Sequence, residues 1–134
     1  MSIGSWDPSA GADTSPAELT PDLLARLAGF SRSDGLADLS EALDDAEKQS
    51  LSALMSMDHD AWRSAGEPLD SDELVHLIRF FAVAENLPGW EAGDKSPVIP
   101  LAKILRQRGE RLDRDMLLWL REVNENRFLP YGPL

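Results

Sequence analysis

LDSDELVHLIRFFAVAENLPGW, residues 69–90, is the longest strongly apolar segment of the chain and contains its own helix start and stop signals. Asp70 and Glu73 have the spacing of a capping box, and the Asn-Leu-Pro-Gly sequence at 86–89 is typical of a helix end. Between these signals, apolar side chains lie on almost every face of the predicted helix: Leu74, Val75, Leu77, Ile78, Phe80, Phe81 and Val83. We therefore expect this helix at the centre of the fold, with Leu74, Leu77 and Phe81 among the most buried residues.

Two helices are predicted before it. The first begins with Thr20 as the N-cap and Pro21 at the first helical position, and ends near residues 29–33. The second is predicted as one continuous amphipathic helix over about residues 35–57, with these residues on its buried face: Leu36, Leu39, Leu43, Ala46, Ser50, Leu54 and Met57. Its opposite face carries an acidic ridge of Asp34, Asp38, Glu41 and Asp45, which we interpret as a solvated face.

Residues 58–66 are predicted as a further helical turn or a loop anchored by Trp62. A fourth helix should start at Ser96-Pro97 and end at Gly109, with a buried stripe of Val98, Leu101, Ala102 and Leu105. Asp113 should cap a fifth helix, with Met116, Trp119, Leu120 and Val123 on its buried face. No segment alternates with the period of a strand, so the sequence predicts an all-α fold, a compact bundle of about five helices.

Length and composition narrow the class of protein. We expect a disordered N-terminal tail over residues 1–18 and a single helical domain over 19–134. Cysteine is absent, and no apolar run approaches the length that a membrane helix needs. Residues 1–96 carry 6 Lys and Arg against 19 Asp and Glu, so the net charge of −11 opposes binding to nucleic acid or anionic lipid. The sequence predicts a cytoplasmic protein with no cofactor.

A few residue pairs are candidates for a ligand or metal site. Glu73 and His76 form an ExxH pair on one helical face, but a di-iron bundle needs that pair twice, so we predict no metal. His76 and Arg79 together mark a weak candidate pocket. Lys95 and Ser96, at the start of the fourth helix, form a weak candidate anion site, although we favour an ordinary helix cap as the explanation of these residues. His59-Asp60 lacks the further histidines of a metal phosphohydrolase.

The fourth and fifth helices have the lengths of a helix-turn-helix. The would-be reading helix opens with Asp113-Arg114-Asp115, which would place two carboxylates near phosphates, so we do not expect direct nucleic-acid binding. Candidate interaction residues lie on the fifth helix and the C-terminal tail: Leu117, Leu118, Phe128, Leu129 and Tyr131. The tail either contacts a partner or folds back onto the core.

No catalytic motif occurs in the chain, so the sequence favours a protein–protein interaction or adaptor module without catalytic residues, as a monomer or homodimer. Two alternatives remain open. One is a small-molecule-binding protein or small enzyme with a pocket near His76 and Arg79. The other is an acidic regulator of a nucleic-acid-binding protein.

Overall fold

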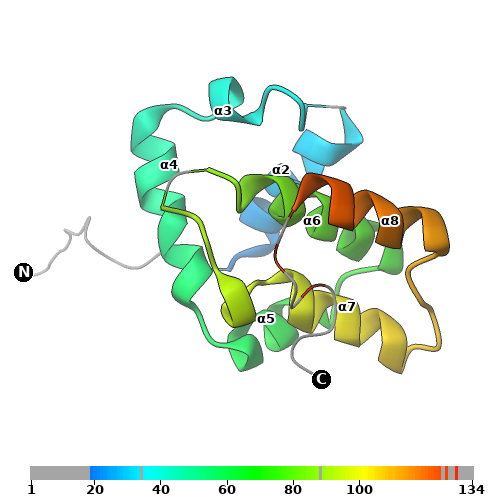
Figure 1. The fold of residues 1–134 in the computed structure, drawn as a ribbon. Helices are drawn as coiled ribbons and strands as arrows, with labels where there is room; N and C mark the ends of the chain where they lie inside the picture. The colour runs from blue at the N-terminus through cyan, green and yellow to red at the C-terminus, as the bar shows by residue number, and fades with distance from the viewer. Residues whose placement is uncertain (1–18, 34, 88, 125, 127–128, 130–134) are drawn as a thin grey trace, which may run out of the picture.

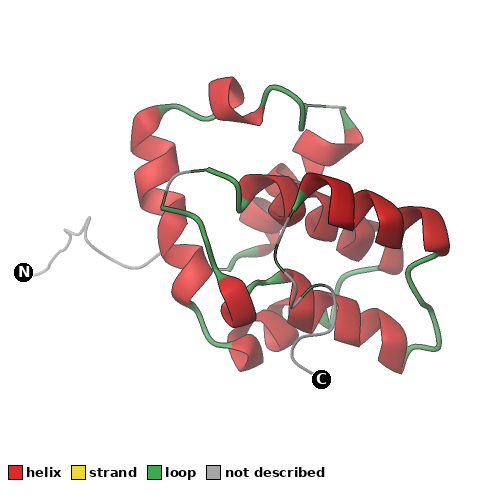
Figure 2. Ribbon diagram, viewed as in Figure 1, coloured by secondary structure: helices red, strands yellow, loops and turns green. Residues whose placement is uncertain are grey.

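The computed structural model describes residues 19–33, 35–87, 89–124, 126 and 129, and this part of the chain is helical without any strand (Figure 2). The all-α prediction is confirmed, whereas the number of helices is larger than five. Seven α-helices and two 3-10 turns follow one another: α2 (Pro21–Arg32), α3 (Leu39–Ala42), α4 (Asp45–Leu51), η1 (Ser52–Ser56), α5 (His59–Gly66), α6 (Ser71–Ala84), η2 (Gly93–Lys95), α7 (Val98–Gln107) and α8 (Arg114–Val123). The tail predicted at 1–18 lies outside the described residues. None of the described helices has the length and apolarity that crossing a bilayer requires.

Helix α6 lies at the centre of the fold, as the sequence predicts, with α2, α7 and α8 packed around it (Figure 1). Its start is set by Asp70, whose carboxylate accepts a hydrogen bond of 2.8 Å from the backbone N–H of Glu73. Leu74, Leu77 and Phe81 are completely buried. Their burial confirms the predicted core.

Aromatic rings surround the middle of α6. Phe81 packs edge-on against Phe80 and against Trp62 of α5, with ring centroids 5.0 and 5.1 Å apart. Trp90 contacts Phe80 from the loop after α6, and its indole N–H donates to the backbone oxygen of Lys48 over 3.0 Å. This bond satisfies the polar atom of a buried ring and joins the loop to α4.

The segment predicted as one helix over residues 35–57 is divided into α3, α4 and η1. Leu43 has an extended backbone, with φ −100° and ψ 128°, and Asp44 then caps a new helix by accepting 2.7 Å from the N–H of Glu47. Aspartate competes with the backbone inside a helix and favours a cap, which explains the break. Because the break resets the helical phase, Ala46 and Ser50 are exposed instead of buried.

Residues 58–66 form a helix, α5, that packs on α7. The two helices pack tightly at Gly66, where a Cβ atom would lie 2.7 Å from Cδ1 of Ile104. Arg108, just after α7, donates to the backbone oxygens of Glu67 and Leu69 over 2.9 and 2.8 Å. These bonds satisfy carbonyl groups at the end of α5 that have no helical partner.

Helices α7 and α8 begin close to their predicted positions. Pro97, and not Ser96, is the N-cap residue of α7, although the Ser96 hydroxyl still accepts 3.2 Å from the N–H of Val98. The predicted stripe of α7 is buried. The predicted buried face of α8 is wrong in part, because Leu120 is buried whereas three other residues are only half-buried: Met116, Trp119 and Val123. Helix α8 lies at the edge of the fold, where pockets flank it.

Candidate functional site

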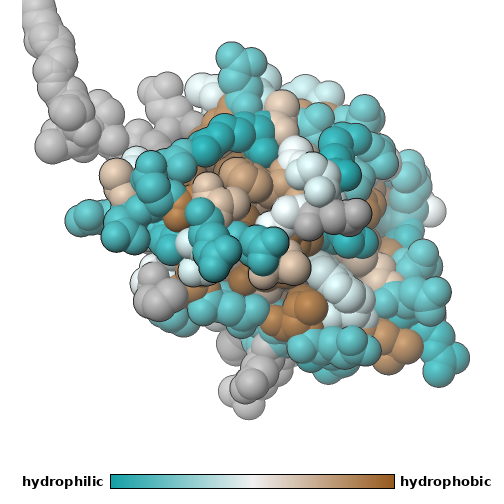
Figure 3. Space-filling model, turned by 90° about the horizontal axis from the view of Figure 1, so that it is seen from above, coloured by the Kyte–Doolittle hydropathy of each residue, from teal (hydrophilic) through white to brown (hydrophobic). Residues whose placement is uncertain are grey.

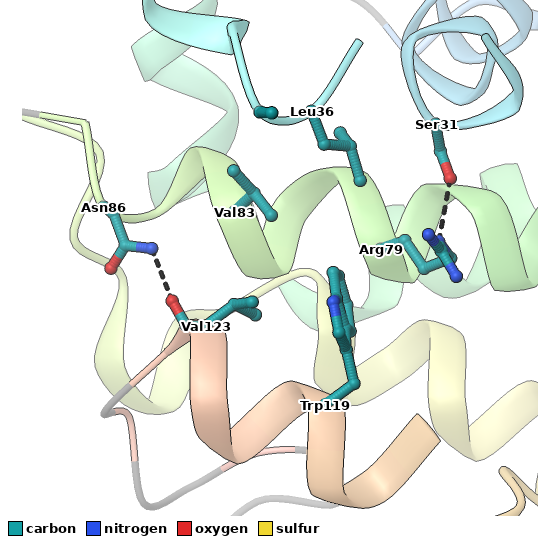
Figure 4. A pocket seen from close by; sticks show the side chains of 8 residues that line it. Ser31, Leu36, Arg79, Val83, Asn86, Trp119 and Val123 are labelled. Atoms are coloured by element: carbon teal, nitrogen blue, oxygen red, sulfur yellow. Dashed lines mark hydrogen bonds between the residues drawn. The ribbon is translucent and has the colours of Figure 1, made fainter. Parts of the chain in front are cut away.

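A pocket of about 600 Å³ lies between α2, the loop that precedes α3, α6 and α8. Apolar side chains form most of its wall, and polar groups stand at its ends (Figure 4). The lining residues are Ser31, Leu36, Ala37, Arg79, Val83, Asn86, Trp119 and Val123. Seen from above, apolar surface is visible between hydrophilic side chains over the middle of the molecule (Figure 3). Pockets of this volume and character are typical of small-molecule sites.

Helical periodicity places the lining residues. Arg79 and Val83 are four residues apart and share one face of α6, and Asn86 follows in the turn after the helix. Trp119 and Val123 are four residues apart on α8 and face them (Figure 4). The Asn86 side chain donates 2.6 Å to the backbone oxygen of Val123, which closes one end of the pocket.

Arg79 is the one charged residue in the wall of this pocket. Its guanidinium carbon lies 4.9 Å from the ring centroid of Trp119, within the range of a cation–π interaction. Its Nε donates to the hydroxyl of Ser31 over 3.1 Å. No carboxylate among the described residues forms an ion pair with it. An arginine half-buried in a strongly acidic protein without such a pair is unusual, because buried charges are normally paired.

A second pocket of about 490 Å³ lies on the other side of the Arg79–Trp119 pair. It is lined by Val75, Arg79, Arg111, Leu112, Asp113, Asp115, Met116 and Trp119. Two arginines there are balanced by two aspartates, whereas the first pocket has the single positive charge of Arg79. The first pocket is therefore the better candidate for an anionic ligand.

Three polar residues lead from Arg79 to the surface. The Ser31 hydroxyl is 2.8 Å from Nδ1 of His76, and Nε2 of His76 is 3.7 Å from Asp72. These are the residue types of a hydrolase triad, but the geometry does not assemble one. The His76–Asp72 distance exceeds a hydrogen bond, and Ser31 lies in the last turn of α2, where free carbonyl groups, not N–H groups, surround it. The chain of contacts instead positions Arg79.

The residues predicted near His76 are partly brought together. His76 and Arg79 both contact Ser31. Arg79 lines the pocket, whereas His76 lies outside it and contacts the Ser31 hydroxyl that Arg79 also bonds. Glu73 points elsewhere, with its carboxylate 4.0 Å from Arg32. No group of three His, Asp or Glu residues suited to a metal occurs in the described part of the chain.

Lys95 and Ser96, predicted as an anion site, face different surroundings. Lys95 is exposed, whereas Ser96 is completely buried and its hydroxyl donates to the carboxylate of Glu85. Among the predicted interaction residues, Leu118 is 50% exposed, Leu117 is half-buried against the core, and Leu129 belongs to the core. Phe128 and Tyr131 lie outside the described residues.

Sequence reasoning missed Glu85, which is only 5% exposed. The carboxyl group lies at a small pocket of about 370 Å³ that Asn86, Glu91 and Asn124 also line. Burial raises its pKa to about 7, because desolvation of the charged form outweighs hydrogen bonds to Ser96, Asn126 and Asn124. Helical spacing could have indicated its burial, because Glu85 lies four residues after the buried Phe81, on the same side of α6.

Comparison of the chain with protein-family models, with curated proteins and with solved structures found no significant match. The geometry of the described residues is therefore the basis of the proposals below.

Proposed function

We propose that this is a binding protein without catalytic activity, and that its ligand is a small molecule with a carboxylate on an apolar body. The observation that supports the proposal is Arg79, a half-buried guanidinium in a pocket wall that has no carboxylate partner among the described residues. A ligand carboxylate would provide that partner.

The guanidinium of Arg79 is preorganised to bind such a ligand. It has five N–H donors, and the contact with Ser31 uses the one on Nε. Stacking on Trp119 fixes the plane of the group, so less side-chain entropy is lost when a carboxylate binds. Planar, bidentate pairing with a carboxylate is the strongest contact that arginine makes with an anion.

The rest of the pocket suits an apolar body. Arg79 and Asn86 stand toward opposite ends, with Val83, Leu36 and Trp119 between them (Figure 4). A ligand with a carboxylate near Arg79 would lay its apolar part along this middle section. Its far end would lie beside the amide of Asn86.

The experiment compares two probes of nearly equal shape, N-acetylphenylalanine and its neutral amide, by ligand-observed NMR titration. We expect the carboxylate to bind and the amide to bind roughly tenfold more weakly or not at all, since a charge-assisted hydrogen bond is about twice as strong as a neutral one. Arg79→Gln should remove this preference.

Arg26→Gln is the matched control. Arg26 also lies over an aromatic ring, 5.6 Å from the centroid of Phe30, but it is paired with Glu47 and is outside the pocket. The control variant changes the net charge equally and should bind like the wild type. Equal binding of both probes, or full binding by Arg79→Gln, would contradict the proposal.

A second candidate function rests on Leu118. This residue is the large apolar side chain that stays exposed in the described part of the chain, and it lies on the outer side of α8. Contact with another protein through this residue remains our second proposal. Its test is capture of a partner by the wild type that Leu118→Asp abolishes while Arg79→Gln preserves it.

A further inference from the structure

Glu85 occupies a junction of three chain segments. It is the C-cap residue of α6, and its carboxylate accepts a hydrogen bond from Ser96, in the loop before α7. The other carboxylate oxygen is 3.5 Å from the side-chain nitrogen of Asn126, beyond α8. One buried carboxyl group therefore contacts the chain before α7 and the chain after α8.

The asparagines around Glu85 complete this junction. The side chain of Asn124 donates 2.9 Å to the backbone oxygen of Ala82, and that of Asn126 donates 2.8 Å to the oxygen of Gly93. Asn86 donates to Val123. The end of α8 is thus attached to α6 and to the loop by several polar groups. Within α8, Leu120 is the one fully buried residue, and Met116, Leu117, Trp119 and Val123 make only partly buried contacts with the core.

We propose that Glu85 is a proton-operated latch: neutral Glu85 holds the end of α8 closed against α6, and ionised Glu85 releases it. A buried carboxylate is stabilised when water reaches it. The cover most easily moved is the segment at Asn124 and Asn126, because α8 has few buried side chains, whereas Ser96 lies in the core.

No charge among the described neighbours of Glu85 stabilises its ionised form. Glu91, exposed, is the other ionisable residue among those that line the pocket at Glu85, and no described basic residue forms an ion pair with Glu85. The pKa of Glu85, raised to about 7 by burial, places the change near neutral pH.

Release of α8 would also change the Arg79 pocket, and this step rests on the proposed function. Trp119 and Val123 form the α8 wall of that pocket. The hydrogen bond to the backbone oxygen of Val123 comes from Asn86, which directly follows Glu85 in the chain. Deprotonation would move this wall. Ligand affinity should therefore be higher below pH 7 than above it.

The test is hydrogen exchange of backbone amides at pH 5.5 and 8.5, followed by mass spectrometry and corrected for the intrinsic pH dependence of exchange. In the wild type, amides of α8 should open roughly thirtyfold more often at pH 8.5, since each pH unit between 5.5 and the pKa of about 7 is a factor of ten in the opening equilibrium. Amides of α6 and α7 should change less. Glu85→Gln, which keeps the shape and stays neutral, should abolish the pH effect on α8.

Glu91→Gln is the matched control, because it removes an exposed charge at the same pocket and should keep the pH effect. Three outcomes would overturn the latch: no pH effect in the wild type, the same effect in Glu85→Gln, or equal loss of protection in α6, α7 and α8. Binding of N-acetylphenylalanine is measured in parallel at both pH values. Failure to bind at either pH contradicts the proposed function and leaves the exchange result as the test of the latch.

Discussion

Helices α6 and α8 begin with nearly the same sequence and end in different environments. Helix α6 starts within the sequence Leu-Asp-Ser-Asp and α8 within Leu-Asp-Arg-Asp. In both, the first aspartate is the N-cap and accepts a hydrogen bond of 2.8 Å from the N–H three residues on. Yet α6 has seven buried residues and α8 has one. The local sequence determines where a helix starts, whereas its neighbours determine how firmly it is held.

The two helices are therefore held in the fold by different kinds of contact. Helix α6 is enclosed by apolar contacts, which act without direction and do not depend on pH. Helix α8 is attached by Leu120, by a few partly buried apolar side chains and by a polar junction whose central group is ionisable. A molecule built this way can loosen α8 without unfolding α6. The following predictions test that contrast, from the largest expected effect to the smallest.

Phe81→Ala should lower the free energy of unfolding by about 3–5 kcal/mol, because it removes a completely buried ring that contacts Phe80 and Trp62. Urea unfolding followed by circular dichroism measures this loss. Leu118→Ala, on α8, is the control and should change stability by less than about 0.5 kcal/mol, since that side chain is exposed. Similar losses in both variants would remove the contrast between the helices.

Glu85→Gln should stabilise the protein most above pH 7. The pKa of Glu85 is raised from 4.5 to about 7, so the folded state binds a proton more tightly than the unfolded state. Wild-type stability from this group is therefore full below about pH 4.5, falls as pH rises toward 7, and levels off above it. The whole change amounts to about 3 kcal/mol, at 1.36 kcal/mol for each pKa unit.

Urea midpoints at several pH values between 5 and 8.5 measure this effect as the difference between variant and wild type, which cancels the shared titrations. Ser96 can accept a hydrogen bond from the new amide as well as donate one, so the neutral side chain fits the junction. A difference that stays constant with pH would show that Glu85 keeps its charge in the fold.

Asp70→Ala and Asp113→Ala remove equivalent caps and should each cost about 1 kcal/mol of helix stability. Their consequences should differ in extent. Loss of the α6 cap should lower global stability, because α6 contacts α2, α7 and α8. Loss of the α8 cap should mainly speed amide exchange within α8. Equal lowering of the urea midpoint by both variants would show that α8 unfolds together with the core.

Much of the fold could be predicted from sequence because helix starts and apolar periodicity are local. The caps at Thr20, Asp70 and Asp113 and the burial of Phe81 agree with the structure. The break at Leu43 could not be predicted from the periodicity, because the apolar spacing continues across it, and Asp44 was one of many acidic residues in that segment.

The candidate site was less predictable. Arg79 was a candidate from sequence, but its partners Ser31 and Trp119 come from α2 and α8, and only the packing of three helices brings them together. Glu85 was missed because a charged residue at a helix end usually faces water. Its partners Ser96, Asn124 and Asn126 are distant in sequence, so the spacing from Phe81 was the one local indication of its burial.

The close approach of α5 and α7 at Gly66 has a consequence for how the sequence can vary. A methyl group at position 66 would meet Cδ1 of Ile104 at 2.7 Å and Cδ2 of Leu101 at 3.1 Å, so these side chains would have to shift within the core. Positions 66 and 104 are therefore coupled: alanine at 66 becomes acceptable when position 104 shortens to valine. Natural variants of this fold should change the two sites together, and a double substitution should recover stability that Gly66→Ala alone loses.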